Sequence, residues 1–173
     1  MRTINSNEID SAITSLAHQI SETHSNTPNI VLAGIANGGI AFSNRLFTEL
    51  KKSYKGQLST GTIDISFHRD DVGQKPILKD IVPTHVLQDP EESLIILVDD
   101  VIFSGRSVRA AIAEIHTIGR PCKVELAVLV DRGNRRLPIA PDYSGFTIET
   151  TLEENVEVHI DLDRSTESKI EIK

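Results

Sequence analysis

The stretch that most constrains what this chain can fold into is residues 94–108, LIILVDDVIFSGRSV. It opens with an unbroken apolar run over residues 94–98, which is typical of a strand buried on both faces of a parallel sheet. A small, hydroxyl-rich turn follows, and apolar residues then recur at helical spacing until Gly119 closes the segment before Pro121. A buried strand that passes directly into a helix predicts one unit of an α/β fold.

The same alternation of strands and helices recurs along most of the chain. Apolar residues at helical spacing predict an amphipathic helix over residues 7–24. Residues 30–35 form an apolar run that ends in a glycine turn before a second helical pattern, and residues 124–130 form another buried strand. Residues 62–67 alternate like a strand buried on one face. We therefore expect a mostly parallel, twisted sheet flanked by helices.

Two parts of the chain depart from this alternation. Residues 68–90 contain three prolines and little periodicity, so we expect a long loop, which we interpret as a flexible lid. From about residue 134 to residue 173 the chain is acidic and rich in turns, with a polar strand or hairpin around residues 147–161, and we interpret this part as a small hood. The total length of 173 residues fits a single domain.

The composition narrows the classes of partner and the cellular location. The 18 basic and 25 acidic side chains give a formal charge of -7, which repels polyanions at long range. The single cysteine, Cys122, excludes an internal disulfide framework and fits a reducing cytoplasm. Because Cys122 stands at the start of an apolar strand, we expect a buried, inert thiol. We see neither a signal peptide nor a membrane span, and we expect a cytoplasmic protein.

The chemistry of residues 99–107 points to a sugar phosphate. Asp99 and Asp100 follow the predicted strand, at the sheet edge where α/β folds bind ligands, and paired carboxylates there can accept hydrogen bonds from two ribose hydroxyls. The turn over residues 104–107 leads into a helix, whose free N–H groups and positive dipole end favour a phosphate. Each residue taken alone fits an ordinary turn or helix cap, but the ordered string favours a ribose 5-phosphate site.

This string resembles the signature that binds phosphoribosyl pyrophosphate (PRPP) in the type I phosphoribosyltransferases. The resemblance implies the type I fold. It also implies that the two acids hold the ribose hydroxyls and take part in catalysis, while residues 103–107 hold the 5-phosphate. The residues of the string that we expect to bind PRPP are Asp99, Asp100, Val101, Ile102, Phe103, Ser104, Gly105, Arg106 and Ser107.

The chain as a whole is similar to the bifunctional pyrimidine operon regulator and uracil phosphoribosyltransferase family. The segments that carry this resemblance are IDISFHRDD at residues 63–71, GRP at residues 119–121 and LAVLVDRG at residues 126–133. The resemblance implies a glycosyltransferase of pyrimidine salvage, which converts uracil and PRPP to UMP and pyrophosphate. It implies Mg2+ carried in by PRPP, with no direct protein ligand to the metal, and a homo-oligomer.

A glycine turn is the expected cradle for the pyrophosphate. Asn37, Gly38 and Gly39 end another strand on the same edge of the sheet, so their backbone N–H groups would face the leaving group. Taken alone, the turn is typical of any strand-to-helix connection. The residue at position 38 is arginine in some of the similar proteins, and glycine stands there in this chain.

The remaining expected site residues lie at the loop and beyond the last parallel strand. Arg69, at the mouth of the long loop, would neutralise the pyrophosphate as a catalytic residue while the loop excludes water. A solvated charge cluster is the competing interpretation of this position. The residues expected near the base are Val130, Asp131 and Arg132.

Two other functions stay open at this point. Members of the similar family that regulate transcription bind messenger RNA, so a uridine-nucleotide-sensing, RNA-binding attenuator is one alternative, and a phosphoribosyltransferase for another base is the second. Arg135 remains of the expected RNA-binding face, but Ala140 and Phe146 stand where basic residues are expected, and residues 149–154 carry three acids in place of lysines. Because phosphate contacts require cations, we do not expect RNA binding.

Overall fold

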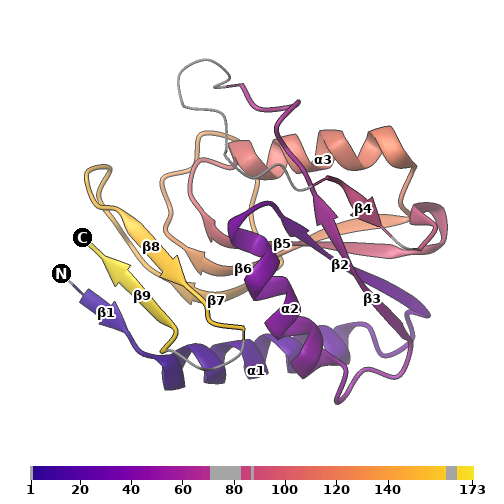
Figure 1. Ribbon diagram of the computed structural model, residues 1–173, viewed down its shortest axis with the longest axis horizontal. Helices are drawn as coiled ribbons and strands as arrows, with labels where there is room; N and C mark the ends of the chain where they lie inside the picture. Colours follow the sequence, from indigo (N-terminus) through magenta and orange to yellow (C-terminus); the bar gives the residue numbers. More distant parts are fainter. Residues whose placement is uncertain (1, 71–82, 87, 163–166) are drawn as a thin grey trace.

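The computed structural model describes residues 2–70, 83–86, 88–162 and 167–173, and it has a central six-stranded sheet between layers of helices (Figure 1). The strand order is β4-β3-β2-β5-β6-β7, and every pairing is parallel except that of β4 with β3. The strands are β2 (Asn29–Ile35), β3 (Gln57–Ile63), β4 (His85–Val86), β5 (Leu94–Ile102), β6 (Lys123–Asp131) and β7 (Tyr143–Thr147). This arrangement confirms the mostly parallel sheet that the apolar runs predict.

Helices cover both faces of this sheet. The helices α1 (Ser6–Thr23) and α2 (Gly38–Leu50) pack on one face, α3 (Arg106–Ile118) packs on the other, and a short 3-10 turn, η1 (Pro90–Glu92), precedes β5. Strands β2 and β5 contribute alternate residues to the two hydrophobic cores, as expected of strands buried on both faces. Within the described residues, no helix combines the length and the apolar character needed to span a membrane.

A second, antiparallel sheet forms the hood. It has three strands in the order β1 (Arg2–Ile4), β9 (Lys169–Ile172) and β8 (Val156–His159). Of the strand or hairpin expected around residues 147–161, the structure has a strand, β8, which pairs with β9, while β7 joins the central sheet beside β6. The part of the chain from residue 134 onward is therefore shared between both sheets.

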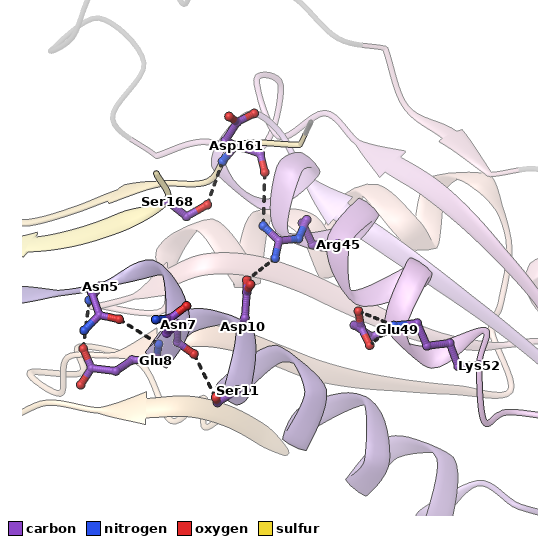
Figure 2. Close-up of polar contacts among 10 residues, drawn as sticks. All are labelled: Asn5, Asn7, Glu8, Asp10, Ser11, Arg45, Glu49, Lys52, Asp161 and Ser168. Atoms are coloured by element: carbon purple, nitrogen blue, oxygen red, sulfur yellow. Dashed lines mark hydrogen bonds and ion pairs between the residues drawn. The ribbon is translucent and has the colours of Figure 1, made fainter. Parts of the chain in front are cut away.

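Polar contacts join the hood to the helices, as Figure 2 shows. Arg45 on α2 donates hydrogen bonds to the carboxylate of Asp10 on α1 and, at 3.2 Å, to the carbonyl oxygen of Asp161 near the hood. The backbone N–H of Asp161 in turn donates to Ser168 Oγ at 3.1 Å, next to β9. These contacts fix the hood against the two helices on the same face.

The structure corrects two predicted strands and one predicted burial. Strand β5 continues to Ile102, so the acidic pair lies inside the strand and not after it. Strand β3 ends at Ile63, and residues 64–68 turn away because the Asp64 carboxylate accepts hydrogen bonds from the N–H and hydroxyl of Ser66, at 3.0 and 2.6 Å. Cys122 is exposed, with its thiol 3.0 Å from the carbonyl oxygen of Ser93.

Most of the predicted lid lies outside the described residues, namely residues 71–82 and 87. The described parts of residues 68–90 contain β4 and η1, so this segment includes short regular elements at its C-terminal end.

Candidate active site

A pocket of about 400 Å³ opens at the carboxyl end of β5, where this strand passes into α3. Its lining comes from the end of β5, from the turn, from the first residues of α3, and from two more distant segments through Arg69, Asp70 and Arg136. A second hollow, on the outer surface of α1, is lined by residues of α1 alone. The first pocket therefore brings together charged and hydroxyl side chains from separate elements.

The turn before α3 lines this pocket and is held in place by the backbone. Gly105 is the residue before the helix and has a φ of 90°, which favours glycine because it has no β-carbon. The carbonyl oxygen of Ser104 accepts hydrogen bonds from the N–H groups of Arg136 and Leu137 at 3.0 and 3.1 Å, which anchors the turn to the segment after β6. The start of α3 is thus held in place at the pocket, as expected of a helix N-terminus that could bind an anion.

The two acids leave β5 in different directions. Ile95 and Leu97 belong to the core under α3, whereas Ile96 and Val98 belong to the core under α1 and α2. The acids continue this alternation: Asp99 lines the pocket, and the carboxylate of Asp100 lies beside Gly38 at the start of α2. Although their side chains leave opposite faces of the sheet, Asp99 and Asp100 are neighbours near the end of β5.

Burial controls the charge of this pair. It raises the pKa of Asp99 well above the ordinary value, and the negative charge of Asp100 raises it further. Burial also raises the pKa of Asp100, although its hydrogen bond from the N–H of Val101 at 2.8 Å opposes that shift. Asp99 is therefore the acid that holds a proton more tightly, and a ligand that donates hydrogen bonds to the pair would favour its ionised form.

The glycine turn between β2 and α2 lies next to the acids. Strands β2 and β5 are paired in register with Gly34 opposite Val98, so both strands end at the same edge of the sheet. A β-carbon on Gly39 would lie 2.1 Å from the carbonyl oxygen of Val98, which explains why glycine is required there. The peptide bond between Ala36 and Asn37 is cis. The structure thus brings Gly38 and Gly39, two of the three expected cradle residues, next to Asp100 and Asp99.

The segment that contains Arg69 borders the same pocket. Arg69 and Asp70 both line it, and the Asp70 carboxylate lies 3.4 Å from Nε of Arg106, the first residue of α3. Arg109, one turn further along α3, donates a hydrogen bond to the carbonyl oxygen of His68. Helix α3 therefore carries both the phosphate turn and the contacts that hold the Arg69 segment.

The side chains of the residues expected near the base are engaged within the protein. The Asp131 carboxylate accepts from the N–H of Gly133 at 2.9 Å and forms an ion pair with Arg135 at 2.6 Å. Arg132 is buried, and its guanidinium lies 4.5 Å from the centre of the Phe103 ring. Arg132 also donates to the carbonyl oxygens of Thr151 and Glu154, at 3.0 and 2.6 Å. These side chains organise the loops, which leaves backbone groups for contact with a base.

Two charged residues that line the pocket were not among the predicted site residues. Arg136 lines the pocket, and its signal was its position just beyond the end of β6 at the ligand-binding edge. Asp70 also lines the pocket, and it was considered only as part of a charge cluster. Both extend the set of charged groups that a phosphorylated ligand would meet.

Comparison with known proteins places this geometry in context. The family model described as the phosphoribosyl transferase domain matches residues 5–164. Bifunctional protein PyrR of Streptomyces coelicolor is 40% identical over 154 residues, which cover 88% of this chain and 79% of that protein. Bifunctional protein PyrR of Clostridioides difficile is 37% identical over 162 residues, which cover 94% of this chain and 91% of that protein.

Solved structures with a similar fold include two purine enzymes. A hypoxanthine-guanine phosphoribosyltransferase from Bacillus anthracis matches with a TM-score of 0.64 and 20% identity, over 90% of this chain and 85% of that one. A hypoxanthine phosphoribosyltransferase from Staphylococcus aureus matches with a TM-score of 0.65 and 18% identity, over 87% and 80% of the two chains. At these identities the likeness concerns the fold alone.

Proposed function

The chain belongs to the phosphoribosyltransferase family and has its type I fold, and on this basis we propose that it transfers the phosphoribosyl group of PRPP to uracil, giving UMP and pyrophosphate. The observation that carries the proposal is a convergence at the carboxyl end of β5. Asp99 and the start of α3 line the pocket there, and Asp100 and the glycine turn before α2 lie beside them. The two acids, the start of α3 and the glycine turn match, in turn, the ribose hydroxyls, the 5-phosphate and the pyrophosphate of PRPP.

The geometry supports transfer through charge stabilisation. Breaking the bond between ribose and pyrophosphate develops positive charge on the ribose and negative charge on the leaving group. Asp99 and Asp100 would accept hydrogen bonds from the ribose hydroxyls and place negative charge beside the developing cation. Arg69 and the N–H groups of the glycine turn would stabilise the departing pyrophosphate. Hydrogen-bond donors held in place before the reaction need no reorganisation in the transition state.

We propose that Mg2+ arrives bound to PRPP and is part of that substrate. Among the residues that the structure describes, no three His, Cys, Asp or Glu side chains gather into a metal-binding group. Asp99 and Asp100 are the carboxylates that would approach a cation held by PRPP oxygens. Bound Mg2+ would neutralise charge on the leaving group. The contribution of the chain is to hold the ribose and both phosphate groups.

The choice of uracil as the base rests on the relatives and not on the fold. The proteins named PyrR cover most of this chain at 37 to 40% identity, whereas the hypoxanthine enzymes share 18 to 20%. The test is UMP formation from uracil and magnesium PRPP, measured by chromatography beside orotate, hypoxanthine and adenine. Turnover with uracil alone is expected. Turnover restricted to a purine or to orotate would mean that this base, and not uracil, is the substrate. A folded protein that is inactive with all four bases would refute the proposal.

An RNA-binding role receives little support from the described surface. Arg135 is an expected RNA contact that remains in this chain. Its guanidinium donates to the carbonyl oxygens of Ile139 and Phe103, each at 2.9 Å, besides its ion pair with Asp131. We therefore propose no RNA regulation, and we propose a cytoplasmic homo-oligomer. A filter-binding salt titration with and without UMP tests the first point, since nucleotide-dependent RNA affinity with a clear salt slope would contradict it.

A further inference from the structure

One carboxylate on α3 holds two segments that are distant in sequence. Glu114 Oε2 lies 3.0 Å from Nε2 of His68, and because a carboxylate only accepts, the imidazole donates this hydrogen bond. Glu114 Oε1 accepts from the hydroxyl of Thr84 at 2.7 Å. The Glu114 side chain is 16% exposed and that of His68 is 28% exposed, so both hydrogen bonds are partly shielded from water.

Further hydrogen bonds complete the attachment of this region to α3. Thr84 Oγ1 accepts from the backbone N–H of Asp64 at 2.9 Å, so the same hydroxyl links the end of β3 to Glu114. The backbone N–H of His68 donates to the carbonyl oxygen of Ile65 at 3.0 Å, and its carbonyl oxygen accepts from Arg109. The segment from residue 64 to residue 68 is therefore fixed on both sides by α3 and by its own turn.

The next residue after this fixed segment is Arg69, which lines the pocket. A cation on an unanchored chain would have to be ordered each time PRPP binds, at a cost in conformational entropy. An anchor one residue away lowers that cost, because it restricts the backbone from which the Arg69 side chain extends. Glu114 itself is absent from the lining of the pocket, so its effect on the ligand would be indirect.

We propose that Glu114 is a positioning residue, which holds His68 and Thr84 together so that Arg69 is presented to the pyrophosphate group of PRPP. The proposal rests on the function proposed above. It goes further by assigning a role in PRPP use to a helix residue that does not touch the substrate.

The test compares Glu114→Gln with a matched control, Glu22→Gln. Glu22 also pairs with a histidine, His18 at 3.4 Å, but on the exposed surface of α1. Glu114→Gln is expected to lower kcat/KM for PRPP by about 10-fold or more, since small misplacements of a catalytic group are costly, while the KM for the base stays unchanged. Glu22→Gln should match the unmodified protein. Glu114→Ala, which removes both hydrogen bonds, should show the larger loss.

A double-mutant cycle with Arg69→Ala separates positioning from general stabilisation. If Glu114 acts through Arg69, then Glu114→Gln has little further effect in the Arg69→Ala background. Full additivity of the two losses, or unchanged kinetics of Glu114→Gln with an unchanged melting temperature, would overturn the proposal. A loss of PRPP use that only tracks a lower melting temperature, and disappears on cooling, would overturn it as well.

Calorimetric titration with magnesium PRPP distinguishes this failure from failure of the proposed function. If the protein binds PRPP but transfers its phosphoribosyl group to no pyrimidine, the assignment of uracil as the base is wrong. The double-mutant cycle is then measured by PRPP affinity in place of kinetics. Glu114→Gln is expected to weaken PRPP binding severalfold. If the folded, unmodified protein does not bind PRPP, both proposals are wrong.

Discussion

The carboxylate of Asp100 lies against Gly38, so that a β-carbon at residue 38 would stand 2.5 Å from Asp100 Oδ2. This contact joins the strand that carries the proposed ribose-binding acids to the turn expected to hold the pyrophosphate. The two halves of the proposed PRPP site therefore share one small volume, and a side chain at residue 38 must displace the acid.

Gly38→Ala is expected to raise the KM for PRPP about 10-fold with little loss of stability, because the displaced group is the mobile end of a side chain. Gly39→Ala serves as the contrast, since its β-carbon would lie 2.1 Å from the backbone oxygen of Val98. A fixed backbone cannot yield, so that variant should lose about 3 kcal/mol of unfolding free energy. Steady-state kinetics and urea unfolding measure the two effects. Similar behaviour of the variants would contradict this account of the turn.

Asp100→Asn is expected to lower kcat/KM for PRPP by about 10- to 100-fold while the fold is kept. The amide retains hydrogen-bonding capacity but lacks the negative charge that complements the developing cation. Kinetics with varied PRPP, together with circular dichroism of the variant, test this. Kinetics equal to those of the unmodified protein would argue against a ribose role for this acid.

Asp99→Asn should stabilise the unliganded protein at neutral pH, by about 1 kcal/mol. Burial and the charge of Asp100 raise the pKa of Asp99 in the folded state, so its favourable contribution is fully present below the unfolded pKa and is lost as pH rises through the folded pKa. An asparagine does not ionise and avoids this loss. Urea unfolding from pH 4 to pH 8 should show a gain that shrinks toward the acid end. A gain that is independent of pH would need another cause.

Glu125→Gln should show the opposite trend. Burial alone would raise the pKa of Glu125, but hydrogen bonds from Lys123, His24 and Tyr143 hold it below the ordinary value. The stabilisation from a lowered pKa is present above the unfolded pKa and is lost as pH falls through the folded pKa. The variant should therefore lose about 1 to 2 kcal/mol at neutral pH and less in acid. Because Glu125 lies near the start of β6, remote from the pocket, PRPP kinetics should not change.

Arg132→Met should lower the unfolding free energy by about 2 kcal/mol, because the carbonyl oxygens of Thr151 and Glu154 lose their donor. Methionine keeps much of the apolar contact with the Phe103 ring. The loop that leads to the hood would loosen, so the KM for uracil should rise more than the KM for PRPP. Equal effects on both constants would indicate that the loop does not border the base.

The local pattern of the sequence predicted the central sheet well and the hood poorly. The apolar runs at residues 94–98 and 124–130 lie in β5 and β6, because a strand buried on both faces needs continuous apolar residues. The hood pairs Arg2 with Ile172 across almost the whole chain. Its strands are too short for periodicity to reveal such a distant partner.

The same limit applies to the site. The acids lie near the end of a strand, and the turn before α3 and the glycine turn each follow a strand, so spacing along the chain predicted where they gather. Glu114 carried no such signal, since its partners His68 and Thr84 lie 46 and 30 residues away. Asp131 and Arg132 were predicted to lie near the base, and the internal partners of their side chains became visible only in three dimensions.

Helix α3 begins directly after Gly105 and carries Glu114 further along. Its length therefore sets the spacing between the turn at Gly105 and the contacts to His68 and Thr84. Each residue of an α-helix advances by about 100° around the axis. Inserting one residue between Gly105 and Glu114 would keep all the residues that make these contacts. It would, however, rotate Glu114 around the helix axis and away from His68 and Thr84. An insertion of about three or four residues would return Glu114 to the same side of the helix, one turn further on. The side of α3 on which Glu114 lies therefore determines which insertions the proposed site tolerates.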